Sequence, residues 1–442
     1  MKASKTTSSW LRRLPAGALG LGLVVASPGA VRGAGFQINE HSARATGMAS
    51  SVVATVGDPS AIFHNPAGLT RIEGTEFQAG LNLIVPHGDY SGPGLVGTDA
   101  ALTDSQDLVN DPVPVPYVYA ARQLSELAYV GLGFYLPYGS GLEWRDPEAF
   151  VGRTQLTELA LRTYYFTPTV AIRFNDVISV AVSASLVPAT LLLSRDLGAT
   201  DTQEPLFAGG GSVDVSGTAF GVGANAGVQL HLVNDHLQIG LNYRSAVNLS
   251  FSGDANFTVP ENLPLEIRAN FPDQNGSGEI TIPHAFSLGI GWVQGPLTIE
   301  AGAQLTLWES YDELRLRFDT GRPAASSASP RNWENVALFR LGGQYTLGAA
   351  AIRLGVGYDI SPIPDSTADF TLPDNDRFYY SVGAGYDFGP LRADVAYMGL
   401  WLTERVIPAS TADEIVNVNL LQGGTFNGGF AHVMSLSLGT RI

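Results

Sequence analysis

Apolar and polar residues alternate with a period of two along most of the chain after residue 75. In the run from Phe286 to Trp292, every second residue is apolar and the residues between them are serine or glycine. In the runs 352–358 and 391–397 every second residue is again apolar, and the residues between are arginine, glycine, aspartate or alanine. Successive side chains of a β-strand point to opposite faces, so each run predicts a strand with one apolar face. That face would meet the core in a soluble sandwich and lipid in a membrane barrel.

The spacing of the turns favours the barrel. Short turns are predicted near 125–126, 175–176, 234–235, 294–295, 347–348 and 389–390, and long Gly/Pro/Asp/Ser-rich loops near 90–112, 140–156, 195–212, 259–278, 320–331, 362–376 and 407–428. These six short turns and seven long loops alternate without a break and join fourteen strands. Outer-membrane barrels have short periplasmic turns and longer outer loops. We therefore expect an all-β, antiparallel transmembrane β-barrel over residues 76–442, with both ends on the periplasmic side.

The first 33 residues have the pattern of a secretory signal peptide. Lys2, Lys5, Arg12 and Arg13 are followed by an apolar stretch over residues 14–26 and then by small residues. This stretch is shorter than the roughly 20 residues that a membrane helix requires. We therefore predict export and, for the mature chain, a place in a Gram-negative outer membrane.

Composition excludes several other classes of protein. The 442 residues include no Cys, which excludes disulfide scaffolds, iron–sulfur centres and Cys-bearing zinc sites. The net charge of −16 argues against a nucleic-acid partner. The seven His show no metal-ligand spacing, and no Ser–His pair suggests a hydrolase, so we expect no metal, cofactor or enzyme activity. An outer-membrane lipid hydrolase is kept as a less favoured alternative.

Residues 34–75 precede the first predicted strand. They are mostly small and polar, with turn signals at Asp58-Pro59 and at Asn65-Pro66. A barrel of fourteen strands encloses more space than the side chains of its wall can fill. The segment also carries apolar residues that could pack inside, such as Phe36. We therefore expect an N-terminal hatch, or plug, in the lumen. A general or substrate-specific porin, without a plug, is the alternative.

Several short runs, in order along the chain, resemble the FadL/TodX family of outer-membrane transporters for long-chain fatty acids. They are 34–40 (AGFQINE), 65–69 (NPAGL), 151–153 (VGR), 243–245 (YRS), 306–311 (TLWESY), 362–365 (PIPD), 372–377 (LPDNDR) and 381–386 (SVGAGY). The resemblance implies a fourteen-stranded barrel with a hatch. It also implies passive uptake of long-chain fatty acids or other hydrophobic molecules. Outer loops would capture the ligand, an interior site would bind it, and the ligand would leave sideways into the membrane.

The same resemblance singles out two sets of site residues. Asn65, Pro66 and Ala67 match the hatch motif, although the same residues also read as an ordinary Asx-type turn. Arg315 lies where the family has a basic residue that binds the ligand's carboxylate, and Arg195 is a second candidate. The alternative for Arg315 is an ion pair with Glu313 or with lipopolysaccharide phosphates.

The predicted third strand is the expected place of lateral exit. Pro137 cannot donate a ladder hydrogen bond, and Gly133 and Gly139 permit a bend. The alternative is a lipid-facing girdle at this strand end. We expect other aromatic residues near strand ends to form such girdles, namely Trp144, Trp333, Tyr379, Tyr380 and Trp401.

Two further sets of residues are expected on the lumen faces of the strands. Glycine pairs at two-residue spacing, such as Gly289 and Gly291, would leave space there for hatch or ligand. A network of charged residues would brace hatch and wall, with Arg244, Glu300, Arg340, Arg353, Arg392 and Asp394 as its members. The expected partners are a hydrophobic ligand, outer-membrane lipids and lipopolysaccharide, and we expect a monomer.

Overall fold

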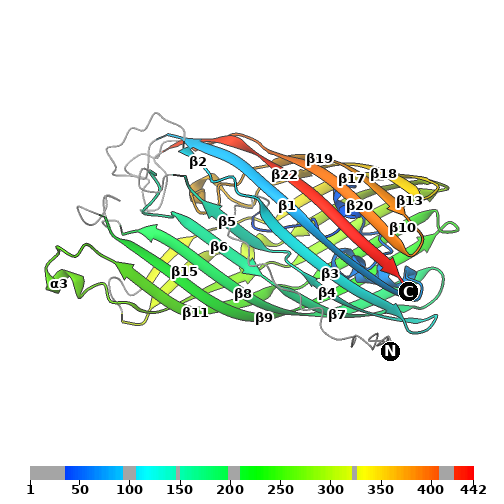
Figure 1. The fold of residues 1–442 in the computed structure, drawn as a ribbon, viewed down its shortest axis with the longest axis horizontal. Coiled ribbons are helices and arrows are strands. Elements are labelled where there is room, and N and C mark those ends of the chain that lie inside the picture. Colours follow the sequence, from blue (N-terminus) through cyan, green and yellow to red (C-terminus); the bar gives the residue numbers. More distant parts are fainter. Residues whose placement is uncertain (1–34, 93–105, 146–149, 198–209, 321–325, 408–422) are drawn as a thin grey trace, which may run out of the picture.

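The computed structural model describes residues 35–92, 106–145, 150–197, 210–320, 326–407 and 423–442, so the predicted signal peptide lies outside the described residues. The described chain forms a closed antiparallel barrel of 14 strands (Figure 1). β1 (Thr75–Ser91) closes the ring by pairing with β22 (Gly424–Arg441). In ring order the strands between them are β3 (Val113–Gln123), β4 (Ala128–Tyr135), β7 (Tyr165–Arg173), β8 (Ile178–Asp196), β9 (Ser212–Leu232), β10 (Leu237–Arg244), β13 (Ala285–Gln294), β14 (Leu297–Thr306), β17 (Val336–Leu347), β18 (Ala350–Asp359), β19 (Arg377–Asp387) and β20 (Leu391–Leu402). The predicted fold class and strand number are confirmed.

Shorter strands extend the wall at the long-loop end. They are β2 (Gln106–Asp107), β5 (Gly139–Glu143), β6 (Glu158–Thr163), β11 (Val247–Thr258), β12 (Gln274–Ile282), β15 (Glu313–Phe318), β16 (Ser326–Pro330) and β21 (Arg405–Ile407). Helix α3 (Leu265–Arg268) lies at the far tip of this end (Figure 1), and two 3₁₀ turns, η2 (Trp308–Ser310) and η3 (Asp365–Thr367), lie in its loops. Among the described residues, no helix is both long enough and apolar enough to cross a membrane.

The apolar faces of the strands point outward. On β18, the side chain of Leu354 is 67% exposed, whereas the neighbouring Arg353 is 1% exposed and lies inside the ring. On β13, Phe286, Leu288, Ile290 and Trp292 are likewise exposed. This is the reverse of a soluble sandwich and is the arrangement of a barrel surrounded by lipid. The alternation in the sequence therefore marks lipid-facing and lumen-facing positions, as predicted.

The prediction of an aromatic girdle is correct only in part. Trp401 and Tyr380 are exposed on the outer face, but Trp144, Trp333 and Tyr379 are buried. Tyr379 and Tyr380 are adjacent on β19, so their side chains must point to opposite faces. Trp144 stacks on Phe150 among the outer loops, with 4.4 Å between ring centroids. The girdle prediction is thus wrong for these three residues.

The two ends of the barrel chain meet among the short turns. The backbone nitrogen of Thr75 donates to the carbonyl of Ile442 at 3.1 Å. The C-terminus lies at the short-turn end of the barrel, opposite α3 (Figure 1). In an outer-membrane barrel the short turns face the periplasm, so β1 begins and β22 ends on the expected side.

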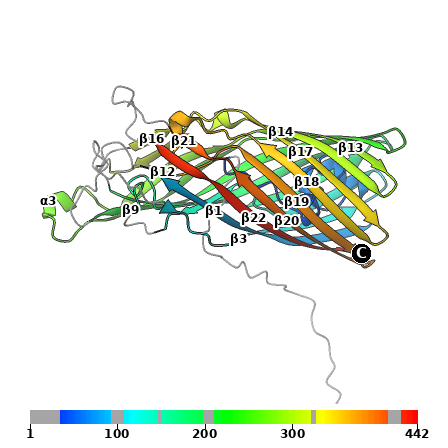
Figure 2. The same cartoon turned by 90° about the horizontal axis from the view of Figure 1, so that it is seen from above.

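Residues 35–74, called the N-terminal segment below, lie inside the ring of strands (Figure 2). The segment contains α1 (Ala43–Thr46), α2 (Ala61–His64) and η1 (Pro66–Arg71). Helix α1 contacts β19, β20 and β22, whereas η1 contacts β7, β8 and β9 on the opposite side of the ring. Most of its side chains are buried. The segment therefore spans the lumen from wall to wall.

Candidate functional site

The third barrel strand is broken where the sequence predicted a bend. β4 ends at Tyr135 and β5 begins at Gly139, with Pro137 between them. β3 pairs with β4 only from Val118 to Gln123, and β5 pairs with β6 instead. The outer half of β3 therefore has no strand partner on this side among the described residues. The wall closes again further out, at a bridge between Leu108 and Trp144.

The N-terminal segment takes up the backbone groups that this break leaves unpaired. The nitrogen of Ile38 donates to the carbonyl of Pro137 at 2.8 Å, and the nitrogen of Gly139 donates to the carbonyl of Phe36 at 2.9 Å. A Cβ atom at Gly133 would lie 2.9 Å from the side chain of Ile62 in the same segment. The structure thus places Pro137 and Gly139 at the gap, against the N-terminal segment, whereas Gly133 packs against the same segment from within the β3–β4 ladder, opposite Tyr119.

Asn65, Pro66 and Ala67 join the N-terminal segment to the wall. The Asn65 side chain caps η1 by accepting from the nitrogen of Ala67 at 3.2 Å. Its amide nitrogen donates to the carbonyl of Val53 at 2.8 Å and to that of Val228, on β9, at 3.0 Å. Asn65 is fully buried. The turn interpretation is therefore correct, and the same side chain also fastens the turn to the barrel.

Glu300 on β14 makes a second attachment. Its carboxylate accepts from the backbone nitrogens of Ala54 and Thr55 at 3.0 and 2.9 Å and from the Thr55 hydroxyl at 2.8 Å. Arg340 donates to the carbonyl of Ser50 at 3.0 Å. Gly289 leaves the room that this requires, because a Cβ atom there would lie 2.5 Å from the Glu300 carboxylate. Glu300 and Arg340 therefore hold the segment and Gly289 accommodates it, as predicted, whereas Arg353 and Arg392 form ion pairs with Asp394 within the wall.

An apolar cavity lies on the outer side of Phe36. It contains about 530 Å³ of empty space, part of it open to solvent. Its wall includes leucines of β6, β8 and β15 and the rings of Phe36 and Trp333. Phe36 packs against Trp308, Tyr311 and Trp333 with ring centroids 4.8, 5.7 and 5.8 Å away. The cavity is therefore an apolar chamber whose inner wall is formed in part by the N-terminal segment.

Arg331 is the charged side chain in the lining of this cavity. It forms an ion pair with Asp369, and both side chains are almost fully buried. Burial acts to lower the pKa of Arg331, but the Asp369 carboxylate and the Tyr311 phenol more than offset it, so the pKa is raised. The Nε–H group of Arg331 has no hydrogen-bond partner. A permanent cation with a free donor thus adjoins an apolar chamber.

The two arginines predicted from the sequence lie close to this chamber on different faces. Leu191 and Leu193 of β8 line the cavity, and alternation places Arg195 on their face. No described residue forms an ion pair with Arg195. On β15, Leu314 lines the cavity, so Arg315 faces the other way and pairs with Glu313 at 2.7 Å. This pairing is the alternative considered for Arg315; ligand contact by either arginine stays a prediction.

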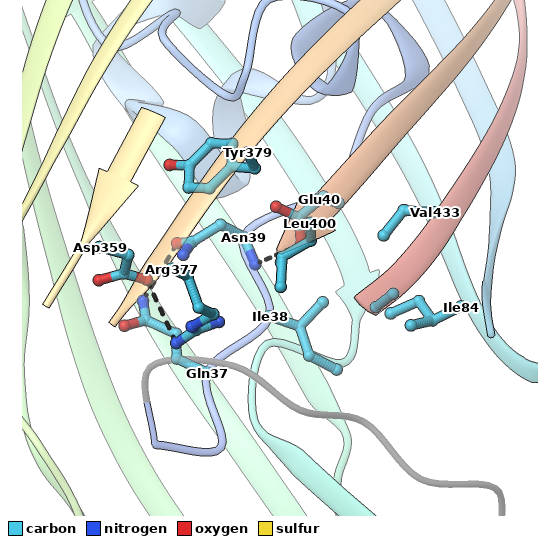
Figure 3. Close-up of a pocket in the computed structure, with 11 residues that line it drawn as sticks. Gln37, Ile38, Asn39, Glu40, Ile84, Asp359, Arg377, Tyr379, Leu400 and Val433 are labelled. Atoms are coloured by element: carbon cyan, nitrogen blue, oxygen red, sulfur yellow. Dashed lines mark hydrogen bonds and ion pairs between the residues drawn. The ribbon is translucent and has the colours of Figure 1, made fainter. Parts of the chain in front are cut away.

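A second cavity has a lining of polar, charged and apolar side chains. It lies between residues 37–40 of the N-terminal segment and the wall strands β18, β19, β20 and β22 (Figure 3). Arg377 lies there beside Asp359, with 3.3 Å between the charged groups. A hydrocarbon chain would have to displace groups that are already paired, so the apolar cavity suits a greasy ligand better. In the described part of the chain, no cluster of three or more His, Asp or Glu residues forms a metal site.

Sequence reasoning missed Arg331 and Asp369. The two lie 38 positions apart, one just before β17 and the other in a long loop, and neither falls in an alternating run. The nearest signal was Trp333, which was assigned to a lipid-facing girdle. Placing that tryptophan inside the barrel would have drawn attention to the arginine two positions before it.

Comparison with known proteins agrees with this architecture. A family model described as "Outer membrane protein transport protein (OMPP1/FadL/TodX)" matches residues 23–438. A long-chain fatty acid transport protein of Escherichia coli is 27% identical over 387 residues, which cover 80% of this chain and 84% of that protein. Outer membrane protein P1 of Haemophilus influenzae is 25% identical over 410 residues, covering 84% and 86%.

Solved structures show the same fold. A Pseudomonas aeruginosa FadL homologue superposes with a TM-score of 0.78 at 20% identity, covering 92% of this chain and 100% of that one. The Pseudomonas putida toluene transporter TodX gives a TM-score of 0.68 at 15% identity, covering 92% and 99%. Because the family model matches nearly the whole chain, this protein belongs to the OMPP1/FadL/TodX family of outer-membrane transporters of hydrophobic compounds.

Proposed function

We propose that this protein takes up long-chain carboxylic acids, and other hydrophobic molecules, by passive transport. The observation that carries the proposal is the apolar cavity with Arg331 in its wall. Each methylene that leaves water for such a cavity contributes about 0.8 kcal/mol. A guanidinium group with a free N–H can bind a carboxylate head group through a charged hydrogen bond. The cavity therefore suits an amphiphile with a long chain and one acidic end.

Capture would begin among the outer loops. An apolar cluster is built there from buried residues of β9 and β11, with Phe257, Leu263, Phe271 and Phe318 packed against it. Leu265 on α3 is 78% exposed at the tip of the same region. Exposed apolar groups beyond the membrane offer a first contact for a hydrophobic ligand. Cluster and cavity lie on the same side of the barrel, because β8 and β15 contribute to the cavity and neighbour β9 and β12.

Release would be lateral, with residues 34–75 acting as a hatch. A ligand that leaves through the periplasmic end must re-enter water, which forfeits the apolar transfer free energy gained on capture. Release through the gap between β3 and β5 keeps that free energy, because the ligand passes directly into the membrane. The N-terminal segment bonds to the backbone on one side of this gap, at Pro137 and Gly139. Its displacement would uncover the opening.

In this proposal the protein is a monomeric transporter, surrounded by outer-membrane lipids and lipopolysaccharide, and it catalyses no reaction. Hydrolysis of ester substrates by the purified protein would contradict this.

Binding in the cavity can be tested through tryptophan fluorescence, since Trp333 lines the cavity. Titration with a sixteen-carbon fatty acid and with hexadecane should change the emission of the purified protein. Leu193→Trp should fill the cavity and lower the affinity of the protein for both ligands. Leu354→Trp, the same substitution on the lipid-facing side, should not. Wild-type protein that binds neither ligand would refute the proposed function. Equal binding by both variants would place the ligand elsewhere.

A further inference from the structure

Arg244 is a buried cation without a carboxylate partner. It ends β10 inside the barrel and is 7% exposed. Its Nη2 group donates to the carbonyl of Phe63 at 2.9 Å, and its Cζ atom lies 4.4 Å from the centroid of the Phe63 ring. No described Asp or Glu forms an ion pair with it, and its Nε–H group has no hydrogen-bond partner. A buried charge in this state is costly unless something else compensates it.

The surroundings of Arg244 add more unused donors. The hydroxyls of Tyr138 and Tyr165 are buried and have no hydrogen-bond partner. Their rings lie 6.2 Å apart, and the charge of Arg244 acts on both phenols. A buried polar group without a hydrogen-bond partner destabilises a protein, so several in one place require an explanation. All three groups can donate to an anion, and no described Asp or Glu forms an ion pair with Arg244.

These donors lie between the apolar cavity and the gap in the wall. Tyr138 belongs to the break between β4 and β5. On its other side is the ring of Phe36, 6.2 Å away, which also lines the cavity. Ser140 lines the cavity as well, and its hydroxyl is a further buried group without a partner. Phe36 therefore separates the chamber from the donors, and its displacement would connect them.

We propose that Arg244, Tyr138 and Tyr165 form a second carboxylate site, occupied after the ligand leaves Arg331 and before its chain enters the membrane. The inference rests on the proposed function and adds a specificity to it. A carboxylate that crosses an apolar interior loses its hydration, and a group of unused donors next to the gap offsets that loss. An uncharged hydrocarbon gains nothing from these donors. The site would therefore favour the passage of acids and have no effect on the passage of hydrocarbons.

The competing explanation is that Arg244 only holds Phe63 and the hatch in place. The two tyrosines separate these explanations, because no protein acceptor is bonded to either hydroxyl. Replacing them by phenylalanine removes no bond to a protein acceptor and keeps both buried rings, so the double variant Tyr138→Phe/Tyr165→Phe should fold as the wild type does. Under the competing explanation it should also transport as the wild type does. Under the proposal it should transport acids more slowly.

The test compares cellular uptake of a radiolabelled sixteen-carbon fatty acid with that of hexadecane. The tyrosine double variant and Arg244→Gln should each lower the ratio of acid to hydrocarbon uptake about tenfold, the effect of one charged hydrogen bond. Arg244→Lys, which keeps the charge, should recover most of this ratio. Tyr90→Phe is the matched control, since the Tyr90 hydroxyl donates to the carbonyl of Gly423 at 2.8 Å, in the outer region, and the ratio should not change.

An unchanged ratio in the tyrosine double variant would overturn the proposal. So would an equal fall for both ligands in Arg244→Gln, which would show a general loosening of the hatch. If Arg244→Gln does not fold, the tyrosine variant alone decides. Failure of the proposed function looks different, because wild-type cells would then take up neither ligand faster than cells that lack the protein.

Discussion

The backbone nitrogen of Gly139 bonds to the carbonyl of Phe36, and not to a neighbouring strand. A wall residue and a hatch residue thus share a hydrogen bond that would otherwise have belonged to the barrel ladder. The same Phe36 forms part of the inner wall of the apolar cavity. Movement of Phe36 would therefore change the cavity and free one edge of the gap together. This relationship links ligand binding to the proposed opening of the wall.

Closing the gap covalently should stop uptake and preserve binding. Val115 on β3 and Leu136 in the strand break belong to the same apolar cluster, and the chain has no Cys of its own. The variant Val115→Cys/Leu136→Cys, once oxidised, should lose fatty acid uptake, because the ligand then has no lateral exit. Fluorescence titration should show unchanged affinity.

The control pair is Ala120→Cys/Leu132→Cys, which joins two residues that already face each other in the β3–β4 ladder. This cross-link should leave uptake unchanged. Normal uptake by the fully cross-linked gap variant would mean that ligand leaves through the periplasmic end, past a displaced hatch.

Removing the ion pair in the cavity should weaken the binding of acids and leave the binding of hydrocarbons unchanged. The double variant Arg331→Gln/Asp369→Asn deletes both charges and so leaves neither of them buried alone. Affinity for the sixteen-carbon acid should fall by about 1.5–3 kcal/mol, the range for a hydrogen bond to a charged group. Affinity for hexadecane should not change. The single variants Arg315→Ala and Arg195→Ala, measured alongside, show whether either arginine also contacts the head group. A loss shared equally by both ligands would indicate damage to the cavity itself.

Glu300 should keep the hatch in the barrel. Glu300→Ala leaves the buried nitrogens of Ala54 and Thr55 without an acceptor, at about 1–3 kcal/mol each. The segment should then detach more often, which planar bilayers would record as a higher ionic conductance. Glu279→Ala, on the exposed outer wall, should leave the conductance at the wild-type level. If the conductance of Glu300→Ala also stays at the wild-type level, this attachment does not hold the hatch in place.

Gly227 on β9 should tolerate no side chain. A Cβ atom there would lie 2.2 Å from the Asn65 side-chain oxygen and 2.8 Å from Pro66. Gly227→Ala should therefore destabilise the protein by about 1–3 kcal/mol, the usual cost of overpacking, and lower the melting temperature. At Gly343 on β17 the nearest atom is 3.8 Å away, so Gly343→Ala should melt as the wild type does. Equal melting temperatures of the two variants would show that Asn65 and Pro66 can move to make room for the added methyl group at little cost.

The wall of this barrel could be predicted from the sequence because its rules are local. Adjacent residues of a strand must face opposite sides, so the run 352–358 determined which of its side chains meet lipid. The alternation of short and long connections determined the strand number. Pro137 marked the break in the third strand, since a residue without an N–H group cannot complete a ladder there. Asn65 marked a turn by its own chemistry, whereas its assignment to a hatch motif came from the family resemblance.

The interior was decided by the tertiary structure. Arg331 meets Asp369 across loops that follow no period, and Arg244 lies near Tyr138 and Tyr165, which are distant from it in the sequence. Arg315 lies one position from Leu314 and so faces away from the cavity that Leu314 lines, while its contact with a ligand stays a prediction. Local patterns specify the face of a strand and the place of a turn. Which distant groups meet, and which of them stay unpaired, depends on how the ring closes around the N-terminal segment.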